Sequence, residues 1–312
     1  MIRTLTPNPS FDHTYRVERF VVGDVNRSTA TTVAAAGKGV NVARDAVANG
    51  GSATAIIPGN EADGSAFVAE LAALGVGCEV VTRAEPTRRN ITVIDDKGIT
   101  SKVNEGGAPI TAGVAEALLA AAAAEPDALV AASGSLAPGT EPDFYVRLAE
   151  RLPAPERMLA LDTSGAALMA CLDTPCLLAK PNRAELEELV GTRLSTYGDL
   201  IDVARELVGR GWANVLVTLG PAGALLVNER GAWAGSAHVD RPVNTVGAGD
   251  AAVAGFLLEP DGDAAALSSA LALARASVLS PDTAGMSISD ADRSAVQLRT
   301  IDESEFLGEN TG

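Results

Sequence analysis

This sequence of 312 residues has few of the side chains that most often bind transition metals or form covalent cross-links. It contains three cysteines and two histidines. No two cysteines form a Cys-x-x-Cys pair, and so small a set of sulfur and imidazole groups argues against a zinc site. An odd number of scattered cysteines also argues against a disulfide framework. These absences favour a reducing, intracellular environment.

Long hydrophobic runs are also lacking. No apolar stretch reaches the length needed to span a membrane without polar interruption. The opening residues Met1-Ile2-Arg3-Thr4 do not resemble a secretory signal peptide. We therefore expect a cytoplasmic protein that does not bind a membrane.

Positive charge is scarce, because 24 basic residues face 40 acidic ones and the net charge is −16. Nucleic-acid binding needs a basic surface, so this balance argues against a nucleic-acid partner. Only four of the basic residues are lysines, and the acidic, lysine-poor composition suggests adaptation to a high-salt cytoplasm. Three of those lysines, Lys38, Lys102 and Lys180, fall inside the motifs described below, where a compact point charge is useful.

Aromatic residues make up only 4% of the chain, which is instead rich in alanine and valine. Valine-rich strands alternate with alanine-rich helices, which predicts an α/β fold with a mostly parallel sheet. The predicted strands are 1–6, 52–58, 127–133, 158–161, 176–179 and 215–217, with an antiparallel edge hairpin at 224–227 and 231–234. The predicted helices are 37–51, 63–74, 112–124, 141–152, 183–190, 200–210, 249–258 and 264–279, followed by a frayed acidic tail from 302 to 312. We found no repeat or linker, so residues 1–312 are expected to form a single domain.

Two polar, β-rich segments interrupt this alternation. Residues 90–94 and 100–103 flank the turn Asp95-Asp96-Lys97-Gly98, which is typical of a β-hairpin. An isolated hairpin is only marginally stable, so we expect it to pair with the earlier polar strands. Together, residues 13–33 and 86–105 are predicted to form a small sheet outside the main domain.

The most informative stretch is Asn244-Thr245-Val246-Gly247-Ala248-Gly249-Asp250, which precedes an apolar helix. Its small residues allow the backbone to approach a ligand, and the first N–H groups of the helix add unpaired donors. Such a turn favours an anion, most naturally a phosphate. Asp250 would repel a phosphate, but it could act as a base toward a hydroxyl that attacks one. The alternative is a glycine turn in which Asp250 caps the helix.

Taken together, the motifs resemble those of the ribokinase-like (PfkB) carbohydrate kinases over nearly the whole chain. The stretch around Asp250 resembles the family's C-terminal signature, and Gly37-Lys38-Gly39-Val40-Asn41-Val42-Ala43 resembles its N-terminal one. Pro7-Asn8-Pro9 with Asp12, Thr87-Arg88-Arg89-Asn90 and Ser133-Gly134-Ser135-Leu136 resemble the branch that phosphorylates sugar phosphates. The first signature has Ala35-Ala36 before Gly37, where many members carry glycine, and this slightly favours a 1-phosphofructokinase-like member.

The resemblance implies a three-layer α/β/α ribokinase-like sandwich with a small β lid, ATP as the donor and Mg²⁺ as a helper. It implies that Asp250 is the catalytic base and that the N–H groups of Gly247, Ala248 and Gly249 form an anion hole. Asn182 and Glu185 match a motif that orders Mg²⁺ through water, although an isolated Asn-x-x-Glu is equally a helix N-terminal cap. The implied nucleotide-binding residues are Lys180, Asn182, Glu185, Thr218, Gly220, Pro221, Ala222, Gly223 and Asn244. The implied or expected sugar-phosphate-binding residues are Asp12, Arg27, Gly37, Lys38, Asn41, Arg88, Lys102 and Ser135.

The leading hypothesis is ATP-dependent phosphorylation of a ketohexose phosphate, with fructose 1-phosphate as the best candidate. Fructose 6-phosphate and tagatose 6-phosphate need the same cations and stay open. A kinase of an unphosphorylated sugar would not need Arg88 and Lys102. A sugar-phosphate-binding regulator on a kinase scaffold is the alternative from another class, and a Rossmann dehydrogenase is disfavoured because no Gly-x-Gly-x-x-Gly follows the first strand. The exposed face of the lid also suggests a homodimer.

Overall fold

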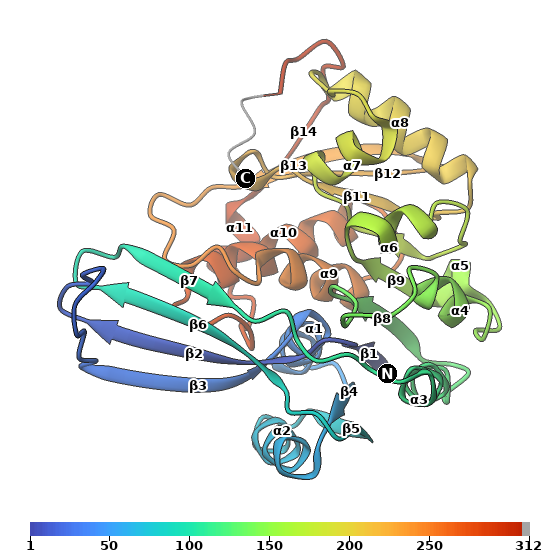
Figure 1. Ribbon diagram of the computed structural model, residues 1–312. Coiled ribbons are helices and arrows are strands. Elements are labelled where there is room, and N and C mark those ends of the chain that lie inside the picture. The colour runs from blue at the N-terminus through green and yellow to red at the C-terminus, as the bar shows by residue number, and fades with distance from the viewer. Residues whose placement is uncertain (308–312) are drawn as a thin grey trace.

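A computed structural model describes residues 1–307 of the chain, and within them two β-sheets are present (Figure 1). The larger sheet has ten strands in the order β14-β13-β12-β11-β10-β9-β8-β1-β4-β5. From β5 to β11 all neighbours are parallel, and β12, β13 and β14 are antiparallel. The strands are β1 (Ile2–Leu5), β4 (Ala53–Gly59), β5 (Gly77–Thr82), β8 (Leu129–Ser133), β9 (Leu159–Asp162), β10 (Leu178–Ala179), β11 (Val215–Thr218), β12 (Ala224–Asn228), β13 (Gly231–Ala237) and β14 (Val296–Arg299).

Helices cover both faces of this sheet. Its strands alternate side chains between the faces, so Val215 and Val217 join one hydrophobic core and Leu216 joins the other. One core is built with α3 (Ala112–Ala122), α4 (Phe144–Ala149), α6 (Gly165–Ala170), α7 (Arg183–Val190) and α8 (Tyr197–Gly209). The other is built with α1 (Lys38–Ala48), α2 (Glu61–Ala73), α9 (Ala248–Leu258) and α10 (Ala264–Leu279). The short helices α5 (Pro155–Met158) and α11 (Asp290–Ala295) complete the set. The predicted three-layer α/β/α arrangement is confirmed.

The smaller sheet projects from the main body and is called the lid below (Figure 1). Its order is β3-β2-β6-β7, made by β2 (Ser10–Val17), β3 (Ala30–Ala36), β6 (Arg88–Asp95) and β7 (Thr100–Asn104). The predicted pairing of the two polar segments is therefore confirmed. Strands β2 and β3 extend beyond the predicted range 13–33, whereas β6 and β7 lie within 86–105. The two central strands, β2 and β6, are parallel, with Ser10 opposite Arg88. Phe11 anchors the lid, because its ring lies 4.7 Å from that of Phe67 on α2.

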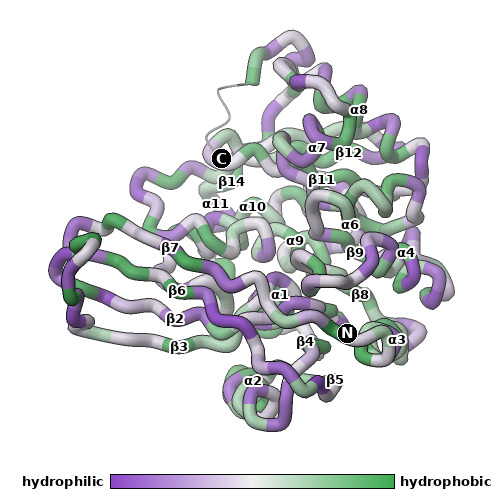
Figure 2. The backbone as a smooth tube through the Cα atoms, in the orientation of Figure 1, coloured by the Kyte–Doolittle hydropathy of each residue, from purple (hydrophilic) through white to green (hydrophobic). Residues whose placement is uncertain are grey.

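The two faces of the lid differ in chemistry. Residues opposite each other in paired strands share a face, so Asp12, Asn90 and Thr92 lie on the same side as Lys102. The other side carries Phe11, Tyr15, Ile91, Val93 and Val103. Figure 2 shows that β6 is hydrophilic where it leaves the core and hydrophobic further out. The lid therefore presents one polar and one largely apolar face.

The C-terminal part of the chain differs from the sequence prediction. Helix α10 does not end the fold, because α11 and β14 follow it and β14 pairs with β13. The hairpin of β12 and β13 is therefore not at the sheet edge. The predicted frayed tail is also wrong for residues 303–307, since Glu303 and Glu305 accept hydrogen bonds from the first turn of α8 and Leu307 donates one to Ser195. The rest of the predicted tail, 308–312, lies outside the described residues.

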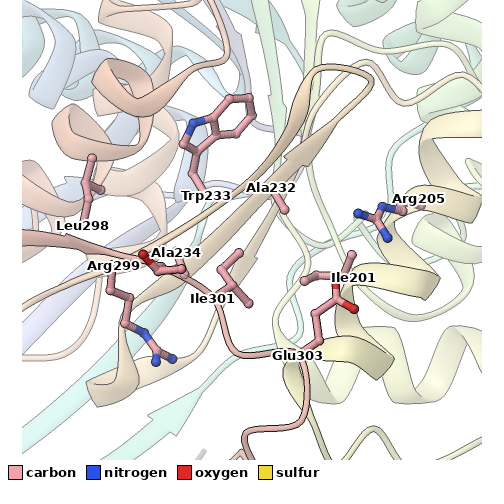
Figure 3. A pocket seen from close by; sticks show the side chains of 10 residues that line it. Ile201, Arg205, Ala232, Trp233, Ala234, Leu298, Arg299, Ile301 and Glu303 are labelled. Atoms are coloured by element: carbon pink, nitrogen blue, oxygen red, sulfur yellow. The ribbon is translucent and has the colours of Figure 1, made fainter.

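A cavity of about 340 Å³ lies between α8, β13 and the segment that includes β14 (Figure 3). Ile201, Ala234 and Ile301 form part of its apolar lining, with Arg205 and Glu303 also on its wall. None of the residues predicted for the functional site lines this cavity. Among residues 1–307, no helix is both long and apolar enough to cross a membrane.

Candidate active site

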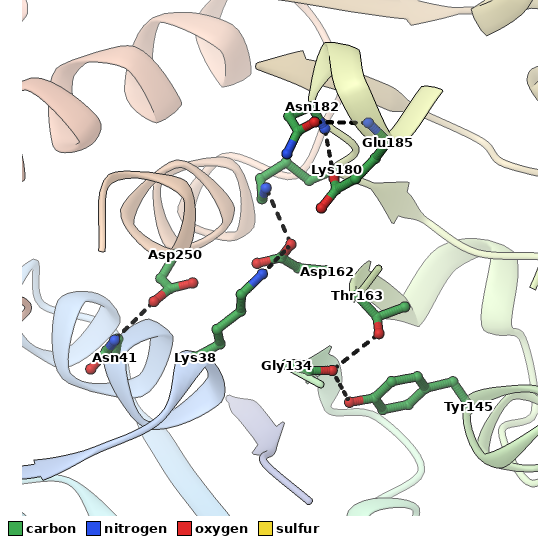
Figure 4. A network of polar contacts seen from close by, with 10 residues as sticks. All are labelled: Lys38, Asn41, Gly134, Tyr145, Asp162, Thr163, Lys180, Asn182, Glu185 and Asp250. Carbon is green, nitrogen blue, oxygen red and sulfur yellow. Dashed lines mark hydrogen bonds and ion pairs between the residues drawn. The ribbon is translucent and has the colours of Figure 1, made fainter. Parts of the chain in front are cut away.

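Several of the predicted functional residues lie together where several strands and two helices meet. Strands β8, β9 and β10 are parallel neighbours, so their carboxyl ends open at the same edge of the sheet. The residues that end or follow them include Gly134, Asp162 and Lys180. The N-terminal turns of α1 and α9 bring Lys38, Asn41 and Asp250 to the same place (Figure 4).

Asp250 lies in the first turn of α9 with only 6% of its surface exposed. Its carboxylate accepts a hydrogen bond of 2.8 Å from the Asn41 amide on α1. Burial, followed by the negative charge of Asp162, raises the pKa of Asp250 to about 7. Lys38, Asn41 and Lys180 oppose this rise. The carboxyl group is thus poised to exchange a proton near neutral pH.

Asp162 is the functional candidate that sequence reasoning left unassigned. It ends β9, is 1% exposed, and bonds through Oδ1 to the ammonium groups of Lys180 at 3.1 Å and Lys38 at 3.2 Å. Burial alone would raise its pKa, but the two lysines outweigh that effect and hold the pKa below its ordinary value. The signal in the sequence was a carboxylate directly after a buried apolar strand, Leu159-Ala160-Leu161-Asp162.

The two lysines reach Asp162 from opposite sides. Lys180 is 6% exposed and follows β10, whereas the side chain of Lys38 is 41% exposed at the start of α1. The charge of Asp162 is the main reason that the pKa of Lys38 is raised, with Asp250 adding to it. Lys38 therefore stays charged, and part of its surface is open to a ligand.

The turn before α9 depends on glycine. Gly247 has a φ of 88°, and a Cβ there would lie 2.1 Å from the carbonyl oxygen of Thr283. Only glycine fits such a position. A Cβ at Gly249 would lie 3.3 Å from Lys180 Nζ, so the turn and this cation are neighbours. The side-chain oxygen of Asn244 supports the turn by accepting a hydrogen bond from the N–H of Val246 at 3.0 Å.

A second glycine-dependent turn precedes α1. Gly37 caps this helix with a φ of 135°, and a Cβ there would lie 2.7 Å from a methyl group of Thr6. The close approach of α1 to the end of β1 therefore depends on glycine at this position. It sets the direction from which Lys38 and Asn41 enter the site.

Asn182 and Glu185 form the helix cap that was the structural alternative for this pair. Asn182 accepts the N–H of Glu185 at 2.9 Å, and Glu185 accepts the N–H of Asn182 at 2.8 Å. These two hydrogen bonds form a capping box, which uses one carboxylate oxygen of Glu185. The buried Oδ2 of Asp162 has no hydrogen-bond partner. No group of three or more acidic, cysteine or histidine side chains among residues 1–307 could hold a metal by itself. The oxygens available fit Mg²⁺, which keeps several waters and uses few carboxylates.

The residues predicted to contact the nucleotide lie on the neighbouring strand ends. Thr218 ends β11 and pairs with Asn182 in an isolated parallel bridge. A 3-10 helix, Gly220–Ala222, follows and includes Pro221. Gly223 has a φ of 99°, and a Cβ there would lie 2.0 Å from the Gly235 carbonyl oxygen, so this turn also requires glycine.

The turn after β8 is locked from behind. The buried Gly134 carbonyl accepts hydrogen bonds from Tyr145 Oη at 2.9 Å and Thr163 Oγ1 at 3.0 Å (Figure 4). Its N–H donates to the Asp162 carbonyl at 2.8 Å. The next residue, Ser135, is exposed. A Cβ at Gly134 would lie 3.8 Å from Lys38 Cβ, so this rigid turn and Lys38 are neighbours.

The four cationic side chains that were predicted to bind the sugar phosphate lie in different parts of the structure. Arg88 and Lys102 lie on the polar face of the lid, where Arg88 is close enough to Asp12 to feel its charge. Arg88 Nη1 donates to the Glu105 carbonyl at 3.0 Å. Lys38 instead belongs to the Asp162 network, and Arg27 is exposed in the loop that joins β2 to β3 at the far end of the lid. These cations do not form one cluster within the chain.

Asp12 is held in place on the lid. Its Oδ1 accepts hydrogen bonds from Ser10 at 2.8 Å and from Asn90 at 2.9 Å. The second carboxylate oxygen is left for another partner. This leaves Asp12 suited to accept a hydrogen bond from a hydroxyl group on the polar face.

The fold, the glycine turn, the buried carboxylate of Asp250 and the two lysines paired with Asp162 are the features of a sugar kinase of the ribokinase-like class. Residues 5–290 match the model of the pfkB family carbohydrate kinases, and the chain belongs to this family. It is 39% identical over 262 residues to the 1-phosphofructokinase of Haloferax volcanii, covering 82% of this chain and 83% of that protein. It is 37% identical over 259 residues to the ATP-dependent 6-phosphofructokinase isozyme 2 of Mycobacterium tuberculosis, covering 81% and 76%. The crystal structure of phosphofructokinase-2 from Escherichia coli with substrates and products has a TM-score of 0.85 and 30% identity, covering 94% of this chain and 97% of that one.

The raised pKa of Asp250 predicts a stability effect that depends on pH. The ordinary pKa of this carboxyl is 3.8 and the folded value is about 7, so burial of the ionised form costs stability. The cost is absent below about pH 4, grows as pH rises to about 7 and then stays constant. We expect Asp250→Asn to raise the melting temperature by at least about 4 °C at pH 8, and by much less near about pH 4.5. Asp202→Asn, at a side chain that is 82% exposed, is the control. Equal shifts at both pH values would contradict this account.

Proposed function

We propose that this protein transfers the γ-phosphoryl group of ATP to O6 of fructose 1-phosphate, forming fructose 1,6-bisphosphate and ADP. The observation that carries the kinase assignment is the buried Asp250 in the glycine turn of α9, beside Lys180 and facing Asn41. The choice of acceptor is supported by the Haloferax relative and by other relatives named 1-phosphofructokinase in Bacillus subtilis and Escherichia coli. The polar lid face with Arg88 and Lys102 suits an acceptor that already carries a phosphate.

In this mechanism Asp250 receives the proton of the O6 hydroxyl while O6 attacks the γ-phosphorus. A new O6–P bond forms, the bond from the γ-phosphorus to the β,γ-bridging oxygen breaks, and ADP leaves. Charge on the moving phosphoryl oxygens is met by the N–H groups of Gly247, Ala248 and Gly249 and by Lys180. The ion pair with Asp162 holds the ammonium group of Lys180 at this position.

Mg²⁺, when bound, would neutralise charge on the ATP phosphates. Asp162 Oδ2 and the carboxylate of Glu185 are the groups that would hold its water ligands, with Asn182 fixing Glu185 by the capping box. Thr218, the 3-10 helix Gly220–Ala222, Gly223 and Asn244 are proposed to bind the nucleotide. Asp12 and Asn41 are proposed to contact the sugar hydroxyls, and Ser135, Arg88, Lys38 and Lys102 its phosphate.

Two other features complete the proposal. The apolar lid face exposes Val33 at 52% and Val103 at 65%, and the lid loop exposes Val22 at 89%. A second copy of the chain would cover this surface. Arg27, which is exposed in the same lid loop, would then lie against that second copy. A monomeric mass by light scattering would exclude the dimer. The net charge of −16 supports a protein that works in high salt.

The acceptor is tested by a coupled ADP-release assay with MgATP at low and at about 2 M KCl, where screening removes the self-repulsion of an acidic chain. Fructose 1-phosphate, fructose 6-phosphate, tagatose 6-phosphate and fructose are compared. We expect fructose 1-phosphate to have the highest kcat/KM, with more activity in high KCl. A preferred 6-phosphate would change the acceptor but keep the base and the fold. Tight ligand binding with no turnover on any acceptor would instead support the non-catalytic regulator.

Asp250→Asn tests the base directly. We expect kcat to fall by at least about three orders of magnitude, because the proton acceptor is lost while the shape of the site is kept. ATP affinity, measured by calorimetry, should change little. The exposed Asp202→Asn should retain normal turnover, and near-normal turnover in Asp250→Asn would rule out this residue as the base.

Arg88→Ala tests the phosphate-binding face of the lid. We expect KM for the sugar phosphate to rise by at least about tenfold and KM for ATP by less than about threefold. Arg89→Ala is the matched control, because Arg89 is the next residue on the same strand and points to the opposite face. Similar increases for both substrates, or for both variants, would contradict a specific role for Arg88.

A further inference from the structure

Helix α1 carries a buried carboxylate, Asp45, that takes no part in the network around Asp250. Its surface is fully buried, and Oδ1 accepts the N–H groups of Gly285 at 2.6 Å and Met286 at 3.1 Å. Oδ2 is also buried and has no hydrogen-bond partner. Burial raises the pKa of Asp45 to about 6. Such a group is costly to bury, and its two bonds to one distant segment suggest what it does.

That segment lies directly behind the anion-binding turn. The carbonyl oxygen of Thr283 lies where a side chain at Gly247 would begin, 2.1 Å from the position of a Cβ atom. The other side of the turn is also held, because the N–H groups of Val243 and Asn244 donate to the carbonyl of Val278 at the end of α10. The conformation of Gly247 is therefore confined by the chain that follows α10.

One face of α1 connects this support to the base. Asn41, Asp45 and Asn49 are four residues apart and so line up along the helix. Asn41 bonds to Asp250, Asp45 holds Gly285 and Met286, and Asn49 holds the next residues by bonding to the Met286 carbonyl and the Ile288 N–H, both at 2.8 Å. A single rigid helix thus contacts the base and also fixes the segment behind the turn.

We propose that Asp45 is a positioning residue for phosphoryl transfer. It holds residues 283–286 against Gly247, so that the first turn of α9 keeps its N–H groups aimed at the transferred phosphate. This inference rests on the proposed function, in which that turn receives the phosphoryl group. A small displacement of such donors lowers the rate of the chemical step more than it weakens substrate binding.

The test compares Asp45→Leu, which removes the acceptor, with Asp45→Asn, which keeps an oxygen for the same two N–H groups. Asn49→Leu is the matched control, because it removes two hydrogen bonds to the same segment, but further from Gly247. Each variant is measured for melting temperature, for kcat and both KM values, and for amide hydrogen exchange in peptides that cover 244–250. Asp45→Ala replaces the leucine variant if leucine prevents folding.

For Asp45→Leu we expect kcat to fall by about 10- to 100-fold, KM for fructose 1-phosphate to stay within about twofold, and exchange at 244–250 to accelerate. Asp45→Asn should restore kcat to within about threefold of the wild type, and Asn49→Leu should lower stability without the same loss of kcat. The proposal is overturned if Asp45→Leu and Asn49→Leu lower kcat equally, or if exchange at 244–250 is unchanged. If the wild-type protein shows no kinase activity, the proposed function fails, and the exchange measurement still decides whether Asp45 holds the turn.

Discussion

The site depends on the balance of charge between two buried carboxylates, Asp162 and Asp250. Burial pushes both toward the neutral form, and each would repel the other if both were ionised. Lys38 and Lys180 bond to Asp162 and lower its pKa, so Asp162 is the carboxylate that is ionised. Its negative charge raises the pKa of Asp250 further. Two carboxyl groups in one region are thus given different protonation behaviour, which is how a single site can combine a fixed anion with a proton acceptor. In a chain of net charge −16, two of the four lysines are used for this purpose.

Helix α1 organises these groups because it meets several parts of the fold at once. Its first residue reaches the end of β9, its fourth reaches α9, and its last two turns hold the chain that follows α10. The partners of Lys38, Asn41 and Asp45 are between 124 and 241 positions away in the sequence. The helix can do this because Gly37 lets it begin in close contact with the end of β1. The geometry of the site is therefore a property of the assembled core and not of any one loop.

Much of this could be predicted from the sequence where the signal is local. The strand and helix alternation, the lid hairpin, and the glycine turn before Asp250 all depend on residues close together in the chain, and each was found where it was expected. Asp45 was missed because a single acidic residue inside a helix has no local signature. The position of Asp162 after an apolar strand was a local signal, but it does not reveal the lysines from distant elements that give this carboxylate its role. Strand β14 was missed because four residues of Val-Gln-Leu-Arg alternate too briefly to distinguish a strand from a loop. Residues 303–307 were wrongly expected to fray, because an acidic composition does not show the backbone bonds that they form with α8.

The parallel pairing of β2 with β6 constrains the order in which the protein can be assembled during synthesis. Ser10 and Arg88 are 78 positions apart (88 minus 10), and β4, α2 and β5 lie between them. Closing so long a loop is unfavourable until the intervening elements have packed against β1. A nascent chain can complete its lid only after Asn104 has left the ribosome, and until β6 has been made, β2 and β3 lack their parallel neighbour. The polar face of the lid is therefore completed only after about the first third of the chain has been synthesised.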